Sequence, residues 1–512
     1  MCGILQEMAA FHTFVFAAYP LLIVIGVNAG VLPFHWSVFF RALAVVLAAT
    51  ALLLVAVKPL IPDLGARSSF MSFTFIAFNL YGGLAGTSVR PWHAAAYTLA
   101  SIALALLMVR PWQARKHKTG VLNLGAAAVL VVYGYAITPA FTDRQEWKPA
   151  ADALIERASA SQQAASGAPR PDIYYVILDG FGRPDILKAN YNLDVDHFVA
   201  ELKARGFEVP ARSQSNYSQT FLSISSSLNL SYLDPVVTTE ESSDQRVLHY
   251  LIQNNALMKL ARRAGYWVLA IGSNYAATEQ LTSADQCHCE QFGLHEVEAT
   301  AIGLTPLRAL PLTRWTYDGH RRKIEGSFRH LRESSGESSP KLVFAHFLSP
   351  HPPFVFTADG SPVDNSSRVY GFQDGHLFAG SAEQYAAGYR AQAQFVAQQV
   401  LATIDTILSR PGPRPVIVLH GDHGPRSMGA LEDTRGEKGR EGVGIFSAYH
   451  FPGDRPAPLR DDITPVNGIR ILANRYLGTS LPAVPDLSFS STLKQPFKFK
   501  RLESPAIAVG VR

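Results

Sequence analysis

Five apolar stretches fill about the first 140 residues of the chain, and each is close to the length of a helix that crosses a bilayer. They cover residues 11–32, 38–61, 68–88, 92–110 and 120–140. A helix needs about 20 predominantly apolar residues to span the hydrocarbon core. The sequence therefore predicts a transmembrane region of five helices over residues 1–142.

Basic residues in the short loops predict how these helices are oriented, because Lys and Arg are retained on the cytoplasmic side. Four of them mark the loop between the fourth and fifth stretches as cytoplasmic: Arg110, Arg115, Lys116 and Lys118. Counting back places Lys58, Arg67 and the amino terminus on the same side. The first stretch has neither a basic leader nor a clear cleavage site, which favours an uncleaved anchor. We therefore expect a multi-pass protein of the plasma (inner) membrane whose later residues lie on the extracytoplasmic side.

The remaining residues have the composition of a linker, an α/β domain and a tail. Residues 143–170 are rich in Ala, Ser, Gln and Gly, which predicts a helical start followed by a flexible linker. From 171 to 480, strand-like runs such as Ile173–Leu178 alternate with helix-like segments. This alternation predicts an α/β sandwich with a mostly parallel central sheet and helices on both faces. Residues 481–512 contain several prolines and are expected to form an extended C-terminal tail along the sheet edge.

Two of the predicted strands end on side chains that commonly bind metals. Asp179 follows the run Ile173–Leu178, and Asp422 and His423 follow the run Val416–Leu419. Ligands of open α/β sheets bind beyond the carboxyl ends of the strands. An Asp, Asp, His set suits zinc or manganese, so we expect one divalent ion, Mn²⁺ or Zn²⁺, held by these three residues. The alternative is that both motifs are turns whose acidic residues cap helices.

A candidate nucleophile lies between these two motifs. The segment from Ser213 to Asn229 changes from a polar run to an apolar-periodic helix at Thr220. A helix amino terminus attracts phosphate or sulfate, and a metal ion can stabilise a threonine alkoxide. We therefore expect Thr220 to be both nucleophile and metal ligand. The alternative makes Thr220 a simple N-cap, and the rival hydroxyls are those of Ser218, Ser223 and Ser225.

Charge and cysteine content exclude some classes of partner and site. The net charge is +5, and the basic residues beyond the helices are interspersed with acids, so no nucleic-acid partner is expected. Cys287 and Cys289 lie in the exported region, where a disulfide can form. A Cys-x-Cys bridge is a tight ring, and the local sequence supplies no further zinc ligands. We expect a structural or incidental role for this pair. Nothing in the sequence indicates the oligomeric state.

The order of the motifs resembles the sulfatase branch of the alkaline phosphatase superfamily. That order is Asp179-Gly180, then Thr220, then Ser349-Pro350-His351-Pro352-Pro353-Phe354, then Gly421-Asp422-His423-Gly424. The five-helix anchor is similar to that of lipoteichoic acid synthases and lipid A phosphoethanolamine transferases. In those two transferase families the first metal carboxylate is Glu, whereas this chain has Asp179.

The resemblance implies a role for each motif. Asp179, Thr220, Asp422 and His423 would bind the metal, and Thr220 would carry the covalent phospho group. His351 would contact the substrate phosphate or protonate a leaving oxygen; otherwise it is a loop residue held by its flanking prolines. His346, earlier on the same strand, points either into the site or into the core.

The resemblance also limits the chemistry. The Cys/Ser-x-Pro/Ala-x-Arg sequence of sulfatases does not follow Asp179, and a second trio of metal ligands is not evident. The expected function is metal-dependent transfer of a phosphoglycerol- or phosphoethanolamine-type group through a phosphothreonine intermediate. The donor would be a membrane lipid, and the acceptor an envelope glycan or lipid. The alternatives are a membrane-anchored phosphoric or sulfuric ester hydrolase and a non-catalytic envelope binding protein.

Overall fold

The structure, a computed structural model, describes ten ranges of the chain. They are residues 10–28, 36–86, 90–113, 118–138, 145–160, 170–310, 312–365, 370–427, 436–453 and 459–502. Arg115 and Lys116, much of the expected linker and the end of the expected tail lie outside these ranges. The chain divides into two compact units, each of which is described separately. The first comprises 1–144, 292–319 and 364–371, and the second comprises 145–291, 320–363 and 372–512.

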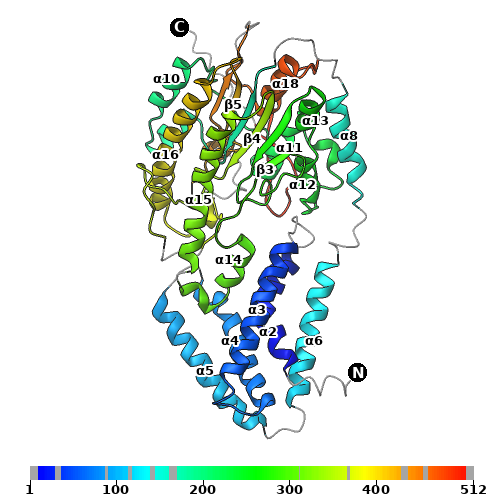
Figure 1. The fold of residues 1–512 in the computed structure, drawn as a ribbon, viewed down its shortest axis with the longest axis vertical. Coiled ribbons are helices and arrows are strands. Elements are labelled where there is room, and N and C mark those ends of the chain that lie inside the picture. The colour runs from blue at the N-terminus through cyan, green and yellow to red at the C-terminus, as the bar shows by residue number, and fades with distance from the viewer. Residues whose placement is uncertain are drawn as a thin grey trace. The chain divides into compact units, whose positions relative to one another are not determined.

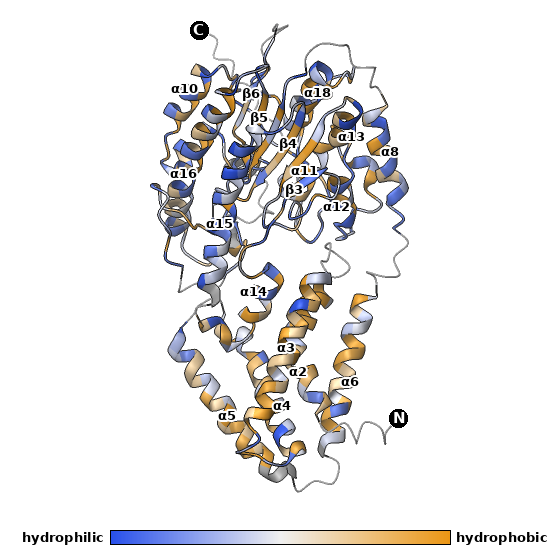
Figure 2. Cartoon of the chain, in the orientation of Figure 1, coloured by the Kyte–Doolittle hydropathy of each residue, from blue (hydrophilic) through white to orange (hydrophobic). Residues whose placement is uncertain are grey.

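Long, mostly apolar helices form the first unit (Figures 1 and 2). They are α2 (Phe11–Asn28), α3 (Trp36–Ala56), α4 (Leu64–Ala85), α5 (Pro91–Gln113) and α6 (Lys118–Ile137). Among the described residues, four spans are long and apolar enough to cross a membrane: Phe11–Asn28, Trp36–Ala56, Pro91–Val109 and Thr119–Ala136. Each of the five predicted stretches thus contains a helix, but α4 is not among the spans that are apolar enough to cross a membrane.

Helix α4 carries polar side chains that form hydrogen bonds with α2. Ser72 of α4 is fully buried, and its Oγ lies 2.6 Å from His12 Nδ1 and 3.3 Å from Thr13 Oγ1. Asn79 Nδ2 donates to the carbonyl oxygen of Phe16 at 2.9 Å. Ser72 and Asn79 of α4 thus find their hydrogen-bond partners inside the first unit.

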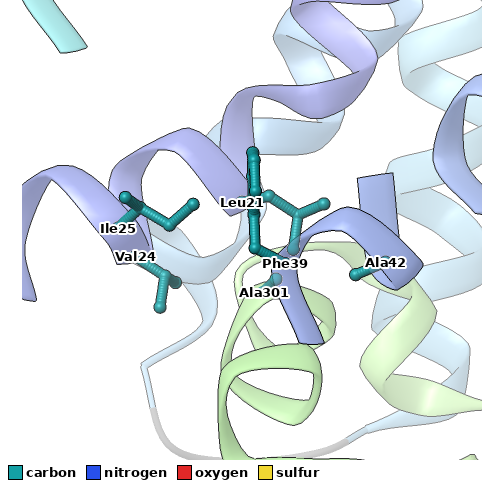
Figure 3. Packing of buried hydrophobic residues seen from close by; sticks show 6 residues of the cluster. All are labelled: Leu21, Val24, Ile25, Phe39, Ala42 and Ala301. Carbon is teal, nitrogen blue, oxygen red and sulfur yellow. The ribbon is translucent and has the colours of Figure 1, made fainter. Parts of the chain in front are cut away.

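A segment from the middle of the chain also belongs to this unit. It contains α14 (Glu296–Gly303) and the 3₁₀ helix η2 (Pro306–Ala309). Ala301 of α14 is buried in an apolar cluster with five residues of α2 and α3, which are Leu21, Val24, Ile25, Phe39 and Ala42 (Figure 3). The Arg41 guanidinium donates to both carboxylate oxygens of Glu298, at 3.0 and 2.7 Å. The sequence placed residues 292–319 within one continuous span, 171–480, whereas their apolar and charged side chains pack with the N-terminal helices.

This packing depends on a glycine that lets two backbones approach. Gly82 N donates to Leu304 O at 3.0 Å, and a Cβ on Gly82 would lie 2.8 Å from Leu304 Cα. A Cβ on the adjacent Gly83 would meet no atom within 4 Å.

We predict that Gly82→Ala detaches this segment, because the added methyl overpacks the contact at a cost of about 1–3 kcal/mol. Gly83→Ala is the matched control, since it carries the same gain in helix propensity without the clash. Limited proteolysis in detergent should show faster cleavage near Leu304 in Gly82→Ala than in the unaltered chain or in Gly83→Ala. Equal cleavage in both variants would contradict the predicted clash.

A six-stranded sheet is the centre of the second unit. Its strands are β1 (Ile173–Leu178), β2 (Trp267–Ile271), β3 (Gln286–His288), β4 (Lys341–Phe347), β5 (Val416–His420) and β6 (Ser447–His450), in the order β3-β2-β4-β1-β5-β6. All neighbouring pairs are parallel except β5 with β6. Strands β1, β4 and β5 are buried along their whole lengths, as expected for a sheet covered on both faces. The predicted mostly parallel sheet is confirmed.

Helices cover both faces of this sheet (Figure 1). One face carries α9 (Pro184–Tyr191), α10 (Asp196–Ala204), α15 (Leu312–Glu333) and α16 (Ala382–Leu408). The other carries α8 (Lys148–Ser159), α11 (Thr220–Leu228), α12 (Arg246–Gln253), α13 (Ala256–Arg263) and α18 (Pro465–Tyr476). Phe328 of α15 packs on Phe347 of β4, with ring centroids 4.2 Å apart. Tyr175 of β1 donates to Ser227 of α11 on the opposite face.

The remaining elements are short. They are α17 (Gly436–Val443), η1 (Asp234–Val236), η3 (Ser334–Gly336), η4 (Gly375–Leu377), β7 (Ser488–Ser490) and β8 (Lys500–Leu502). Strands β7 and β8 form an antiparallel pair within the expected tail, and Phe489 stacks on Tyr217. The expected linker begins with α8, which packs against α12 and α13. The expected linker, 143–170, and the expected tail, 481–512, therefore both contain regular secondary structure.

Candidate active site

The ends of three adjacent strands place several polar side chains in one region. Strand β1 lies between β4 and β5, and Ile177 is level with His346 on one side and with His420 on the other. Asp179 is the residue directly after β1, and its N–H donates to Phe347 O at 2.9 Å. Because the strands are parallel, residues that follow β1 and β5 emerge at the same edge of the sheet.

At this edge three of the four predicted metal ligands converge. His423 Nε2 lies 3.3 Å from Asp179 Oδ1 and 3.7 Å from Asp422 Oδ2. His346 Nε2 lies 3.4 Å from Asp179 Oδ2. All four side chains are at most 1% exposed. The structure thus brings together Asp179, Asp422 and His423, and it points His346 into the site rather than into the core.

These side chains fit a divalent ion, because the atoms that face one another form no hydrogen bonds with other described residues. Asp179 Oδ1, Asp422 Oδ2, His346 Nε2 and His423 Nε2 are buried without a hydrogen-bond partner among the described residues. Leaving one such atom unpaired costs about 1–3 kcal/mol, so four at one place indicate a missing ligand. Nitrogen and carboxylate oxygen donors suit zinc and manganese.

The opposite atom of each ligand is held in the way that metal ligands usually are. His423 Nδ1 lies 2.8 Å from Gly424 O, and a carbonyl only accepts, so the proton is on Nδ1 and Nε2 carries the lone pair. His346 Nδ1 is 2.6 Å from the Thr278 hydroxyl. Asp422 Oδ1 accepts from Gly180 N at 3.0 Å.

Electrostatics keep Asp179 ionised. Burial alone would raise the pKa of its carboxyl group, but the imidazoles of His351, His346 and His423 hold that pKa well below its ordinary value. For His423, burial and the nearby Arg426 lower the pKa, yet the Asp422 and Asp179 carboxylates raise it above the ordinary value. The cluster therefore favours a bound cation.

Thr220 is the first residue of α11 and is 8% exposed. The N-cap is Gln219, so the interpretation of Thr220 as a simple N-cap is wrong. The Thr220 hydroxyl forms no hydrogen bond with another described residue. Among the rivals, Ser225 donates to Leu248 O of α12 and is occupied. No contact joins Thr220 to the four convergent atoms within the described residues, so its role as a metal ligand stays a prediction.

His351 lies in the loop after β4 and faces the same cluster. Its N–H donates to Asp179 O at 3.0 Å, and its ring meets that of His423 edge-on, with centroids 5.9 Å apart. Its Nδ1 donates to Pro352 O, and its Nε2 lies 3.6 Å from Asp374 Oδ2. An imidazole oriented in this way can donate or accept a proton at Nε2.

Two charged residues of the site were not predicted from the sequence. Asp374 lies beside His351 Nε2, and its Oδ2 is 3.4 Å from Arg426 Nη1. The Arg426 guanidinium also donates to the carbonyl oxygen of Ser218, two residues before Thr220. These contacts connect the His351 loop with the start of α11. The sequence does contain a signal for Arg426, because this basic residue lies only three positions after His423. It contains none for Asp374, which lies in a segment without a motif.

A buried amide holds the His351 loop in place. Gln392 of α16 is fully buried; its Oε1 accepts from Val355 N at 2.8 Å, and its Nε2 donates to His351 O at 3.0 Å. It is therefore the side chain that fixes the backbone of this loop to the helix behind it.

We predict that Gln392→Ala leaves these buried backbone groups unpaired and lowers the free energy of unfolding by about 3 kcal/mol. Activity should fall as well, because His351 loses its fixed position. Gln398→Ala is the control, since Gln398 is an exposed residue of the same helix. Thermal unfolding measures the first effect and turnover below the unfolding temperature the second. Equal stability of the two variants would show that Gln392 does not organise the loop.

Comparisons with known proteins find matches among solved structures only. No protein-family model matches the chain, and no curated protein matches it. Matching solved structures include the periplasmic domain of EptC from Escherichia coli in complex with Zn (14% identity, 64% of this chain, 91% of that chain, TM-score 0.41). They also include the phosphoethanolamine transferase EptA from Neisseria meningitidis (13%, 88%, 88%, 0.34) and the lipoteichoic acid synthase LtaP from Listeria monocytogenes (15%, 67%, 81%, 0.37).

Sulfatases are also among the matched structures. Their identities and TM-scores are low, so a function for this chain has to be argued from its own side chains.

Proposed function

We propose that the chain is a membrane-anchored, metal-dependent enzyme that transfers a phospho-linked group from a lipid donor. The observation that carries the proposal is the set of four unpaired, buried ligand atoms at the ends of β1, β4 and β5. Arg426 links this region to the segment that begins α11, where the Thr220 hydroxyl forms no hydrogen bond with another described residue. Together these are a cation site, an anion-attracting helix start and a nucleophile.

Asp179, Asp422 and His423 hold one divalent ion, zinc or manganese, with Thr220 as a further ligand; His346 is placed to join them. When bound, such an ion neutralises phosphate charge and favours the threonine alkoxide. Arg426 adds a fixed positive charge beside the Ser218–Thr220 segment, where the phosphate oxygens would lie.

In the first half-reaction, the Thr220 alkoxide attacks the phosphorus of a lipid phosphodiester. The bond from phosphorus to the diacylglycerol oxygen breaks, and that oxygen takes a proton from His351 Nε2. In the second, an acceptor hydroxyl on an envelope glycan or lipid gives its proton to the same nitrogen and attacks the phosphothreonine. The alkoxide is restored, so protons and bonds balance over the cycle. Transferred groups of the phosphoglycerol or phosphoethanolamine type fit this chemistry.

The N-terminal helices favour a lipid donor over a soluble ester. We propose that α4 spans the membrane together with α2, α3, α5 and α6, because its polar side chains face other helices and need not meet lipid. Five crossings, with the amino terminus inside, place the unit that contains the sheet on the extracytoplasmic side of the inner membrane. If water replaces the acceptor, the same site is a phosphoric ester hydrolase.

We predict that Thr220→Ala abolishes a covalent intermediate and lowers transfer by roughly 10³-fold or more, because the nucleophile is removed. The purified chain is incubated with phospholipid labelled in its headgroup and with manganese or zinc, and peptides are searched by mass spectrometry for modified threonine. Ser218→Ala is the control and should keep the modified Thr220 peptide. A modified serine, or labelling that persists in Thr220→Ala, would rule out the assigned nucleophile.

We also predict that Asp422→Asn loses one equivalent of tightly bound metal, since an amide is a weaker ligand for these ions than a carboxylate. Asp374→Asn is the matched control: it should keep its metal and lose activity, because Asp374 contacts His351 and Arg426 and is not among the convergent ligands. Metal content is measured by mass spectrometry after dialysis. Unchanged metal in Asp422→Asn would show that the ligands are wrongly assigned.

A further inference from the structure

A second group of metal-type side chains lies at the edge of the sheet. It consists of His288 in β3, Glu290 just after β3, and His330 in α15. One donor atom from each lies within 4.8 Å of the other two. Glu333, one helical turn after His330, brings Oε2 within 3.3 Å of His330 Nδ1.

From this arrangement we propose a second divalent cation site, distinct from the candidate active site, with His288, Glu290 and His330 as ligands and Glu333 as the fourth. Two imidazoles and two carboxylates are a complete tetrahedral set for zinc. The ion would tie the three-residue edge strand β3 to helix α15. Its role is therefore structural, because no open position is left for a substrate.

The site is separate from the active site in the sheet. His288 is level with Ile271 of β2, which is level with Ala345 of β4. Strand β3 is thus three positions from β1 in the strand order, and at about 4.8 Å per strand the separation is roughly 14 Å. An ion at His288 would share no ligand with the Asp179 cluster.

The two imidazoles are in direct contact and are suited to act as neutral ligands. The rings of His288 and His330 stack with centroids 4.0 Å apart and an interplanar angle of 8°. Two protonated rings in this position would repel each other.

Only small movements are needed to close the site. Ligands of a tetrahedral zinc ion lie about 3.3 Å apart, given bonds of roughly 2.0–2.1 Å. His288 Nδ1 is already 3.7 Å from Glu290 Oε1, and Lys323 fixes the strand by donating to His288 O at 3.2 Å. One ring has to turn out of the stack so that both lone pairs can face the ion. Glu333 is more than half exposed, and its carboxylate already lies beside His330.

The neighbouring cysteines do not belong to this group. Cys287 and Cys289 are joined by a disulfide, and side chains alternate along a strand, so the pair faces away from His288. Cys289 Sγ instead lies against the backbone of Gly272. The expected structural role of this pair fits that position.

The test is titration of the tag-free, full-length chain in detergent with Co²⁺, whose visible spectrum reports tetrahedral sites, followed by displacement with Zn²⁺. We expect two equivalents in the unaltered chain and one in Asp422→Asn. His330→Ala and Glu290→Gln should each lose one equivalent, and combining either with Asp422→Asn should leave none. Glu290→Gln keeps the size of an exposed side chain, so its loss of metal is not a loss of fold.

Two control variants sharpen the outcome. His197→Ala, which removes an exposed histidine of α10, and the Cys287→Ser/Cys289→Ser double variant should both keep two equivalents. A stoichiometry that stays at two in both His330→Ala and Glu290→Gln would overturn the second site. So would loss of an equivalent in the cysteine variant with none lost in His330→Ala.

Discussion

The parallel pairing of β1 with β4 and β5 is the constraint on which the site depends. It places Asp179 next to the end of β4 and brings Asp422 and His423, which come shortly after β5, to the same edge. A one-residue slip in register would turn every side chain of a strand to the opposite face. The buried, apolar strands oppose such a slip, because their residues are covered by helices on both sides. The packing energy of the sheet thus holds these charged groups close together and buried, although their mutual repulsion and their loss of solvation oppose this placement.

The free-energy cost of burying these polar atoms explains the chemistry of the site. Four donor or acceptor atoms are buried with no hydrogen-bond partner among the described residues, and one ion would satisfy all four. Around them, the remaining polar atoms of His346, His423 and Asp422 are hydrogen-bonded to fixed backbone or hydroxyl groups. The ligands are therefore oriented before the ion arrives. Asp374 extends this order to His351 and Arg426, which adds a group for proton transfer and a positive charge.

Strand-end residues could be predicted from the sequence, whereas residues joined only by tertiary folding could not. Asp179, Asp422 and His423 follow continuous apolar runs, so their place at the sheet edge followed from local pattern. Asp374 lies in a segment with no such pattern, and only the folded chain brings it to His351. Residues 292–319 were assigned to the later domain by their position in the chain, yet Ala301 and Glu298 pack with the N-terminal helices. The composition of α4 was likewise set by partners that lie far away in the sequence.

The central claim is that the ends of β1 and β5 hold one catalytic metal ion beside Thr220. The most direct measurement is anomalous diffraction at the zinc edge from crystals of the full-length chain grown with zinc. We predict a peak within bonding distance, roughly 2.0–2.2 Å, of Asp179, Asp422 and His423, with the Thr220 hydroxyl completing the coordination. A zinc-loaded crystal without a peak at these residues, or with the Thr220 hydroxyl turned away from it, would contradict the account.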